Sequence, residues 1–560
     1  MQQVPEMFGA EQSPLWGRAK VAGNLVRCGI FISILTFSAG CGRREPHSAN
    51  AGMPSQSRIL NRGMPGEPRT LDPQLADDNF SFLILRDLYE GLTAENRDGT
   101  IAPGAASSWD IDRSGTTYSF HLRPDARWSD GRQIVAAEFV QGLRRAVDPK
   151  TGSGSAAVLS VIKGAADVIA GRNKVSNLGV AAVSDNLLRI ELEHPAPYIL
   201  QILSLPIAAP VHLQKALSSD LSQTQTKVTV SNGPYTLVNR VTGSFIELAR
   251  NSNYWDASNV HIERVRYVNS ESEATELREY TAGQLDMTFT IPMPDLKRVL
   301  QRYPDEVQTS PVVGTLFLAL NLSEPRLREN TSVRQALSMA VDRDSIAKYV
   351  MMGATPAYAL VAQGASGYVS PFYNWTKWTR ERQLNNARDL MAQAGYSKVH
   401  PLRLKLYFNT GETIQRIMIA VAESWKKNLG VETELESDEF RVFLVGRKDR
   451  HHWDIVRIGW YADFDDASSF LELFTRNSNQ NDPGYSNPTF DKLIDAARVE
   501  ANPKARLGML EQSEGVLMND YPIVPIYFYQ ARRLAKPYLG GAAITPMNRT
   551  YSKHLFWKNQ

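Results

Sequence analysis

Cysteine is almost absent from this sequence. The 560 residues include two cysteines, Cys28 and Cys41, and both lie close to the N-terminus. The chain beyond Cys41 therefore cannot contain a disulfide framework or a zinc site built on cysteine thiolates. Net charge is also small, because 62 basic residues are balanced by 59 acidic ones and no long basic run occurs. This balance argues against nucleic acid as a partner.

The N-terminal part lacks an apolar run long enough to span a membrane. Residues 28–40 form an apolar run of 13 residues, whereas a membrane-spanning helix needs about 20. Three basic residues, Arg18, Lys20 and Arg27, precede this run. A basic segment followed by a short apolar run is typical of a signal peptide, which we predict over residues 1–40. The sequence therefore predicts export to the periplasm or cell envelope.

The predicted signal peptide ends in a lipoprotein-like motif. Ser38-Ala39-Gly40-Cys41 resembles a bacterial lipoprotein processing site, at which the cysteine becomes the lipidated first residue. Lipidation of Cys41 would anchor the protein in the inner membrane. The alternative is plain secretion, in which Cys41 has no role. Residues 41–57 are polar and rich in Pro, Ser and Gly, which predicts a flexible tether.

The remaining chain alternates between strand-like and helix-like hydrophobic periodicity. Apolar and polar residues alternate over residues 117–122, 188–193 and 402–408, which predicts half-buried strands. Apolar residues recur at helical spacing over residues 80–92 and 414–429, which predicts helices. Strands that alternate with helices in this way indicate a mixed α/β fold.

One stretch, Val456–Phe464, combines a strand with charged and aromatic side chains. It contains Arg457, Gly459, Trp460, Tyr461 and Asp463. Core strands seldom contain charges, because a dehydrated charge needs a partner. The combination predicts the wall of a ligand site. We expect Asp463 to bind an ammonium group of the ligand, and Trp460 and Arg457 to line the cavity.

Each of these residues also has a purely structural interpretation. Asp463 could cap a turn, as aspartates often do. Arg457 could pair with Asp454 or another neighbouring acid, and Trp460 could belong to the core.

Metal sites, cofactor sites and catalytic motifs are not predicted. His451 and His452 are adjacent, so in a strand they point to opposite faces and do not form a metal-binding pair. The sequence contains no G-x-S-x-G, no P-loop and no H-E-x-x-H. We therefore expect a binding protein without catalysis and without a cofactor.

Nine short phrases occur in the same order and spacing as in one protein family. They are Glu67–Pro73, Leu88–Leu92, Tyr118–Arg123, Trp128–Gly131, Asn232–Tyr235, Asn253–Trp255, Ala340–Arg343, Gly459–Asp463 and the strand that ends at Tyr529. Together they resemble the family 5 extracellular solute-binding proteins, which are the peptide-binding subunits of ABC importers. The resemblance covers about residues 58–555 and is strongest to the oligopeptide-binding branch.

The resemblance implies a two-lobed α/β clamp, the Venus flytrap fold of periplasmic binding proteins, with an extra inserted domain. Lobe I would be discontinuous and consist of residues 58–79, 206–312 and 531–560. The inserted domain, called the insert below, would be residues 80–205, and lobe II would be residues 313–530. The crossovers near residues 312 and 530 would act as the hinge.

The resemblance also assigns roles to site residues. Asp463 would pair with the α-ammonium of a peptide, and Arg457 would meet the carboxylate of a short peptide. The other implied ligand positions are Trp460, Gly459, Tyr461, Tyr529, Phe440, Glu67 and Arg447. The implied partners are a peptide ligand and the permease subunits of an ABC importer, and the protein is expected to act as a monomer.

Several family positions are changed in this chain. Leu316–Ala319 lies on the crossover strand where family members have tyrosines and an acid. Ser338 and Ile414 occupy the positions of a lysine and a histidine that meet the carboxyl ends of longer peptides. The carboxyl-terminal anchors are therefore reduced to Arg457 and Arg447, which favours a short or modified peptide.

Two classes of alternative remain open. The same fold hosts other solutes in relatives, so the ligand could be a dipeptide, a murein peptide, an opine, a sugar or a nickel complex. More remotely, the protein could be a peptide hydrolase or a sensor. Turnover of a peptide over time would indicate an enzyme, whereas stoichiometric retention would indicate an importer subunit.

The loss of the carboxyl-terminal anchors leads to a prediction about ligand length. We expect the purified protein to bind peptides shorter than about five residues, because the charges that hold longer chains are missing. Calorimetric titration with a length series of peptides measures this. Binding restricted to peptides of about five residues or more would contradict it.

Overall fold

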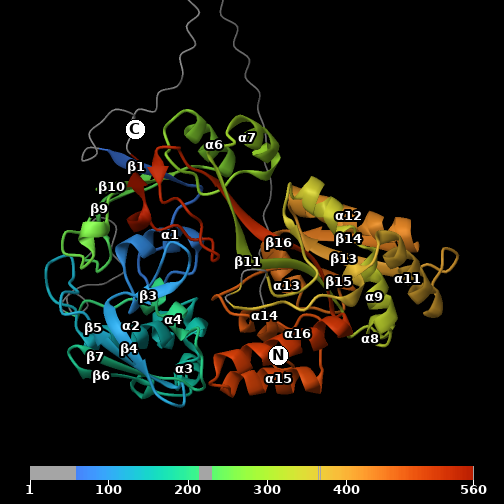
Figure 1. Ribbon diagram of the computed structural model, residues 1–560, viewed down its shortest axis with the longest axis horizontal. Coiled ribbons are helices and arrows are strands. Elements are labelled where there is room, and N and C mark those ends of the chain that lie inside the picture. The colour runs from blue at the N-terminus through green and yellow to red at the C-terminus, as the bar shows by residue number, and fades with distance from the viewer. Residues whose placement is uncertain (1–57, 214–229, 363–364, 366, 559–560) are drawn as a thin grey trace, which may run out of the picture. The chain divides into compact units, whose positions relative to one another are not determined.

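The computed structural model describes residues 58–213, 230–362, 365 and 367–558 (Figure 1). The predicted signal peptide at 1–40, the tether at 41–57 and the lipidation site Cys41 lie outside these residues. Among the helices that the structure describes, none is both long and apolar enough to cross a membrane.

A four-stranded sheet contains the first strand of the described chain. Its order is β1 (Ile59–Met64), β10 (Arg264–Asn269), β9 (Phe245–Arg250) and β8 (Tyr235–Val241), with β1 parallel to β10 and the other pairs antiparallel. The helix α1 (Asn79–Leu88) packs on it and begins at Asp78, whose carboxylate accepts the N–H groups of Phe80 and Ser81. The predicted helix 80–92 is wrong at its end, because the chain becomes extended at Tyr89.

A second four-stranded sheet lies within the insert. Its antiparallel order is β4 (Ala106–Ile111), β5 (Thr117–Leu122), β7 (Leu187–Glu191) and β6 (Val180–Ser184). The predicted strand 117–122 is confirmed, and the strand predicted at 188–193 begins and ends slightly earlier. The helix α2 (Ala136–Val147) contacts β6 and β7 and shares a buried hydrophobic cluster with this sheet. The short elements of this region are β2 (Thr93–Glu95), β3 (Ile101–Pro103), α3 (Ala165–Ile169) and α4 (Ile199–Ile202).

The largest sheet has six strands and contains the stretch singled out above. Its order is β12 (Thr355–Pro356), β16 (Ile523–Leu534), β11 (Val307–Leu320), β15 (Ile455–Tyr461), β13 (Arg403–Asn409) and β14 (Glu432–Asp438). The strand predicted at 402–408 is confirmed with a shift of one residue, and the helix predicted at 414–429 begins at Glu412.

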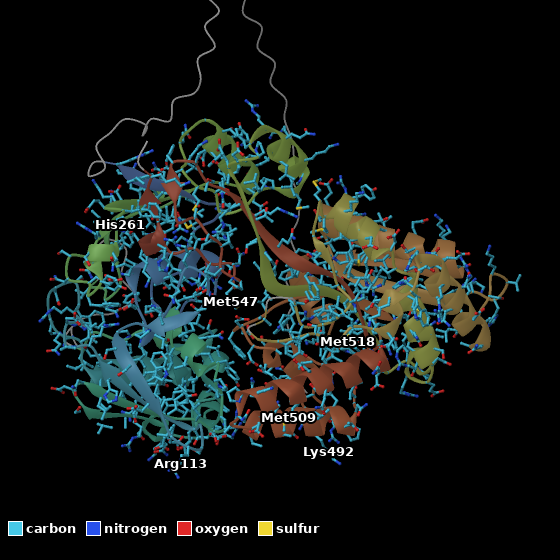
Figure 2. All side chains as sticks on the ribbon, viewed as in Figure 1. Arg113, His261, Lys492, Met509, Met518 and Met547 are labelled. Carbon is cyan, nitrogen blue, oxygen red and sulfur yellow. The ribbon has the colours of Figure 1, made fainter. Side chains whose placement is uncertain are left out.

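Helices surround this sheet and complete the largest core cluster. They are α8 (Pro325–Arg328), α9 (Thr331–Ala340), α10 (Arg343–Ser345), α11 (Arg380–Gln393), α12 (Glu412–Leu429), α13 (Phe440–Gly446), α14 (Ser468–Leu471), α15 (Pro488–Val499) and α16 (Pro503–Asp520). On α16, Met518 lies in the core and Met509 packs against its edge (Figure 2). Such burial of apolar side chains is the main term that stabilises the sheet against its helices.

Two long strands, β11 and β16, run side by side through the molecule (Figure 1). They pair antiparallel from Val307 opposite Leu534 to Ala319 opposite Ile523, with an irregular register between Pro311 and Thr315. Leu534 packs in a different cluster, with residues of α6 (Glu273–Thr281) and α7 (Leu296–Arg302). The two strands thus pass from one hydrophobic cluster to another near the predicted crossovers. This is consistent with the predicted lobe boundaries, which stay a prediction.

A buried carboxyl group fixes α16 to the chain segment that follows β12. Glu514 is fully buried, and its Oε1 accepts the backbone N–H groups of Leu360 (2.7 Å) and Val361 (2.8 Å). Its other oxygen accepts the Tyr368 hydroxyl at 2.7 Å. Burial raises the pKa of Glu514 from its ordinary value to about 7, and these hydrogen bonds oppose the rise only in part.

The raised pKa predicts a pH-dependent effect of removing this charge. The folded protein holds the Glu514 proton more tightly than the unfolded chain does. The contribution of Glu514 to stability is therefore complete below about pH 4.5 and is lost as the pH rises through about 7. Glu514→Gln should remove this loss, so the free energy of unfolding of the variant, relative to wild type, should increase by about 2 kcal/mol from pH 5 to pH 8.

Urea denaturation of both proteins at the two pH values measures the effect. Glu423→Gln, at an exposed position of α12, is the matched control and should show no such change. A Glu514→Gln protein whose stability follows the same pH dependence as wild type would show that Glu514 titrates normally.

Candidate functional site

The strand β15 places its side chains alternately on two faces of the six-stranded sheet. It pairs with β11, so that Gly459 lies opposite Leu316 and Arg457 opposite Leu318. Because side chains alternate along a strand, Arg457, Gly459 and Tyr461 share one face. The other face carries Val456 and Ile458, both buried, and Trp460.

On the first face, a guanidinium and two phenol rings form one cluster. The ring of Tyr461 stacks on that of Tyr529 from β16, with centroids 4.3 Å apart and planes 18° apart. Arg457 donates from Nη2 to the Tyr529 hydroxyl and from Nη1 to the Asn409 side-chain oxygen, both at 3.1 Å. Tyr527 meets the Tyr529 ring edge-on at 5.3 Å. The structure thus brings together three predicted site residues, Arg457, Tyr461 and Tyr529.

Two glycines make room for this cluster. A Cβ atom on Gly459 would overlap the Tyr529 hydroxyl and lie 2.9 Å from Arg457 Nη2. A Cβ atom on Gly314 of β11 would lie 2.9 Å from the Tyr461 ring and 3.0 Å from the Tyr529 ring. These separations are shorter than a Cβ atom normally makes, so glycine at both positions lets the aromatic rings lie flat on the strands.

The positive charge of Arg457 is not neutralised by an acid among the described residues. Both groups that accept its hydrogen bonds are neutral, since burial raises the pKa of the Tyr529 hydroxyl and keeps it protonated. The Nε atom of Arg457 is buried and has no hydrogen-bond partner. A half-buried guanidinium in this state is suited to bind a carboxylate from outside the protein.

The alternative pairing of Arg457 with Asp454 is wrong. Asp454 is buried and pairs with Arg326, and it also accepts the backbone N–H of Lys405 at 2.8 Å. Asp454 lies three positions before Arg457, so strand alternation directs the two side chains to opposite faces of the sheet.

Trp460 lies on the other face of β15 and is hydrogen-bonded to the segment that follows this strand. Its indole N–H donates to the Ser469 carbonyl at 2.9 Å, and its ring packs against the largest core cluster. The Ser469 hydroxyl accepts the backbone N–H of Asp463, also at 2.9 Å. Trp460 and Asp463 are therefore both held by Ser469, Trp460 through its indole and Asp463 through its backbone N–H.

The carboxylate of Asp463 forms no hydrogen bond or ion pair with any residue that the structure describes. Desolvation by the surrounding protein raises its pKa above the ordinary aspartate value. Its proposed structural role, capping a turn, belongs instead to Asp466, whose carboxylate accepts the Ser468 N–H at 2.9 Å. Asp463 thus presents an acceptor that is suited to a cation from outside the protein.

Three predicted ligand positions lie apart from this cluster in every contact that the structure describes. Glu67 accepts the Gly243 N–H at 2.5 Å and pairs with Arg240 at 3.5 Å. Arg447 pairs with Asp482 at 3.5 Å and donates to Gln480 at 3.0 Å. Phe440, at the start of α13, is 51% exposed. Their ligand roles stay predictions, and Arg447 is engaged by an internal acid.

The structure adds Asn409, Gly314, Tyr527 and Ser469 to the residues found from the sequence. Asn409 and Tyr529 reach Arg457 across 48 and 72 residues of sequence. Neighbours that meet only through sheet pairing leave no local signal in the sequence. Ser338, one of the positions where the resemblance implies a charged residue, is buried and accepts a hydrogen bond from Arg343 at 3.0 Å.

Comparison with known proteins identifies relatives over most of the chain. The model of the bacterial extracellular solute-binding proteins, family 5 (middle region), matches residues 100–482. The periplasmic oligopeptide-binding protein OppA of Escherichia coli is 32% identical over 95% of this chain and 98% of its own length. The "Probable deoxycholate-binding periplasmic protein YgiS" of Escherichia coli is also 32% identical, over 88% of this chain and 92% of its own.

Among solved structures, the unliganded open form of MppA, a periplasmic murein tripeptide binding protein, is similar to this chain. It aligns with a TM-score of 0.81 and 33% identity, over 89% of this chain and 97% of that structure. This similarity shows that the fold is the two-lobed α/β clamp of periplasmic binding proteins.

Substitution of Gly459 tests the close packing of this cluster. Gly459→Ala should displace the Tyr529 hydroxyl and break its hydrogen bond with Arg457, at a cost in unfolding free energy of about 1–2 kcal/mol. Thermal unfolding and near-ultraviolet circular dichroism measure the stability and the tyrosine environment.

Gly508→Ala on α16 is the control, because a Cβ atom there meets no atom within 4 Å. In the middle of a helix this change should stabilise by about 0.5–1 kcal/mol. If Gly459→Ala is as well tolerated as Gly508→Ala, then the close packing over Gly459 is not a constraint.

Proposed function

Because the chain belongs to the family 5 bacterial extracellular solute-binding proteins, we propose that it captures short peptides between its two lobes for an ABC importer. In this role the protein delivers the peptide to the permease subunits and performs no catalysis. One observation carries the choice of ligand. A carboxylate and a guanidinium that no described residue neutralises, Asp463 and Arg457, lie six residues apart at the end of one strand.

A peptide with free ends has one positive and one negative end, which are opposite in charge to Asp463 and Arg457. Its α-ammonium would bind Asp463 and its α-carboxylate would bind Arg457. Ionic hydrogen bonds of this kind are stronger than neutral ones when a closed site excludes water. The six-residue separation spans at most about 20 Å of extended chain, so a ligand that meets both groups has about six residues or fewer.

Overall sequence identity does not discriminate between a peptide and deoxycholate as the ligand, but the local charges favour a peptide. OppA and the protein named for deoxycholate are each 32% identical to this chain, although their names give different ligands. Deoxycholate has a carboxylate but no ammonium, so it would leave Asp463 without a partner. An unpaired carboxylate that becomes buried costs free energy, and this cost favours ligands that have an ammonium group.

The remaining assignments follow from the same proposal. The stacked rings of Tyr461 and Tyr529, with Gly459 beneath them, would form a wall beside the Arg457 end of the ligand. Trp460 would support the Asp463 end, while Glu67, Phe440 and Arg447 would lie along the path of longer ligands.

We propose residues 58–79, 206–312 and 531–560 as lobe I, residues 80–205 as the insert and residues 313–530 as lobe II, with hinges near 312 and 530. The protein would act in the periplasm as a monomer, held at the membrane by lipidated Cys41.

Removal of the Asp463 carboxylate tests the proposed function. Wild type should bind trialanine more tightly than N-acetyl-trialanine, because only the first has an ammonium group. Asp463→Ala should weaken trialanine binding by about 10- to 100-fold, since one charge-assisted hydrogen bond contributes about 1.5–3 kcal/mol. Isothermal titration calorimetry measures both affinities.

A control variant and a pH profile make this result specific. Asp389→Ala removes an exposed carboxylate on α11 and should leave both affinities unchanged. Because desolvation raises the pKa of Asp463, wild-type affinity should fall on acidification at a higher pH than an ordinary aspartate would cause, and Asp463→Asn should abolish this fall. Equal affinity of wild type and Asp463→Ala for trialanine would refute the role of Asp463.

A further inference from the structure

The loop that carries Asp463, residues 462–467, joins β15 to α14 and is in contact with the insert. Phe464, the next residue after Asp463, stacks on Tyr198 of the insert, with ring centroids 4.1 Å apart and planes 9° apart. Phe464 packs against the hydrophobic cluster of the insert, although the strand that precedes it, β15, belongs to the six-stranded sheet. The loop is therefore partly built into the core of another region.

A side-chain amide of the insert binds the backbone of the same loop. Gln201 of α4 donates from Nε2 to the Asp465 carbonyl at 3.1 Å, and its Oε1 accepts the Asp465 N–H at 2.5 Å. Both polar groups of the amide are thus used on a single backbone residue. Two hydrogen bonds to one residue fix its orientation as well as its position, because a rotation of the backbone breaks at least one of them.

A buried arginine completes the same contact. Arg506 of α16 binds both carboxylate oxygens of Asp466, at 2.7 and 2.9 Å, and its guanidinium carbon lies 5.7 Å from the centre of the Tyr198 ring. It is only 5% exposed. The cation therefore lies between the loop and the ring on which Phe464 stacks, where burial strengthens its interactions with both.

These contacts hold the backbone of Asp463 and the three residues that follow it, but they do not involve the Asp463 carboxylate. The backbone N–H of Asp463 is bound by Ser469, and the next three residues are bound by Tyr198, Gln201 and Arg506. An acceptor held in this way does not have to be ordered when the ligand arrives, and a preorganised group binds more tightly for that reason.

We propose that Gln201 of the insert is a positioning residue for Asp463, so that the insert sets the affinity for the ligand's ammonium group. This inference rests on the proposed function, in which Asp463 binds that ammonium. Gln201 acts on the ligand through the backbone of Asp465 and through Asp463, and both the nitrogen and the oxygen of its amide are bound to the loop.

A double-mutant cycle tests the positioning role. The four proteins are wild type, Gln201→Met, Asp463→Asn and the double variant, and the measurement is the calorimetric affinity for trialanine. Gln201→Met has a side chain of similar size and removes both hydrogen bonds. It should weaken binding by about 10-fold when Asp463 is present and by less than about 2-fold in the Asp463→Asn background.

The outcomes separate this inference from the proposed function. If Asp463→Asn alone leaves the affinity unchanged, the proposed function fails. If Asp463→Asn weakens binding as expected but Gln201→Met has the same effect in both backgrounds, or no effect in either, then only the positioning role is overturned.

A matched control excludes a general effect of changing the insert. Gln133 is exposed in the insert, and no hydrogen bond or ion pair joins its side chain to residues 462–467, all of which the structure describes. Gln133→Met should therefore bind trialanine as wild type does. A loss of affinity in Gln133→Met equal to that in Gln201→Met would show that the effect does not pass through Asp465, and would overturn the positioning role.

Discussion

The pairing of β11 with β15 on one side and β16 on the other determines where the candidate site lies. This pairing brings Arg457 of β15 within hydrogen-bonding distance of Tyr529 of β16, although Leu318 and its neighbours on β11 separate the two strands. Gly314 and Gly459 are required by the same pairing, because side chains there would occupy the space of the tyrosine rings. The buried residues Leu316–Ala319 supply the apolar centre of the sheet, and Arg457 lies beside them, opposite Leu318.

The sheet leaves two charges without internal partners. Some buried charges of the described chain are paired with an opposite charge, as with Asp454 and Arg326, or Arg506 and Asp466. Arg457 is bound only by neutral groups, and the Asp463 carboxylate is bound by no described residue. Arg457 is half-buried and Asp463 is exposed, so water screens both charges in the free protein, and a ligand of opposite charge pairs with them when a closed site excludes that water. This is the physical reason to assign the ends of a zwitterionic peptide to these two residues.

The sequence predicted local structure well and spatial neighbours poorly. The strand at 117–122 and the strand in the Val456–Phe464 stretch are present, because alternation of apolar and polar residues reports directly on a half-buried strand. The helix predicted at 80–92 ends early, since its apolar pattern continues past the point where the backbone becomes extended. The contact of Gln201 with Asp465 spans 264 residues, and no local pattern encodes it. Asp454 is not the partner of Arg457, because strand alternation directs the two side chains to opposite faces and Asp454 pairs with Arg326.

The identity of the small molecule that the protein retains is the most direct test of peptide capture at Asp463 and Arg457. The soluble part from residue 42 would be purified under native conditions, and its bound molecule identified by mass spectrometry after denaturation. Peptide capture predicts a stoichiometric short peptide with a free α-ammonium group. A retained sugar, bile acid or other molecule without an ammonium group would contradict it.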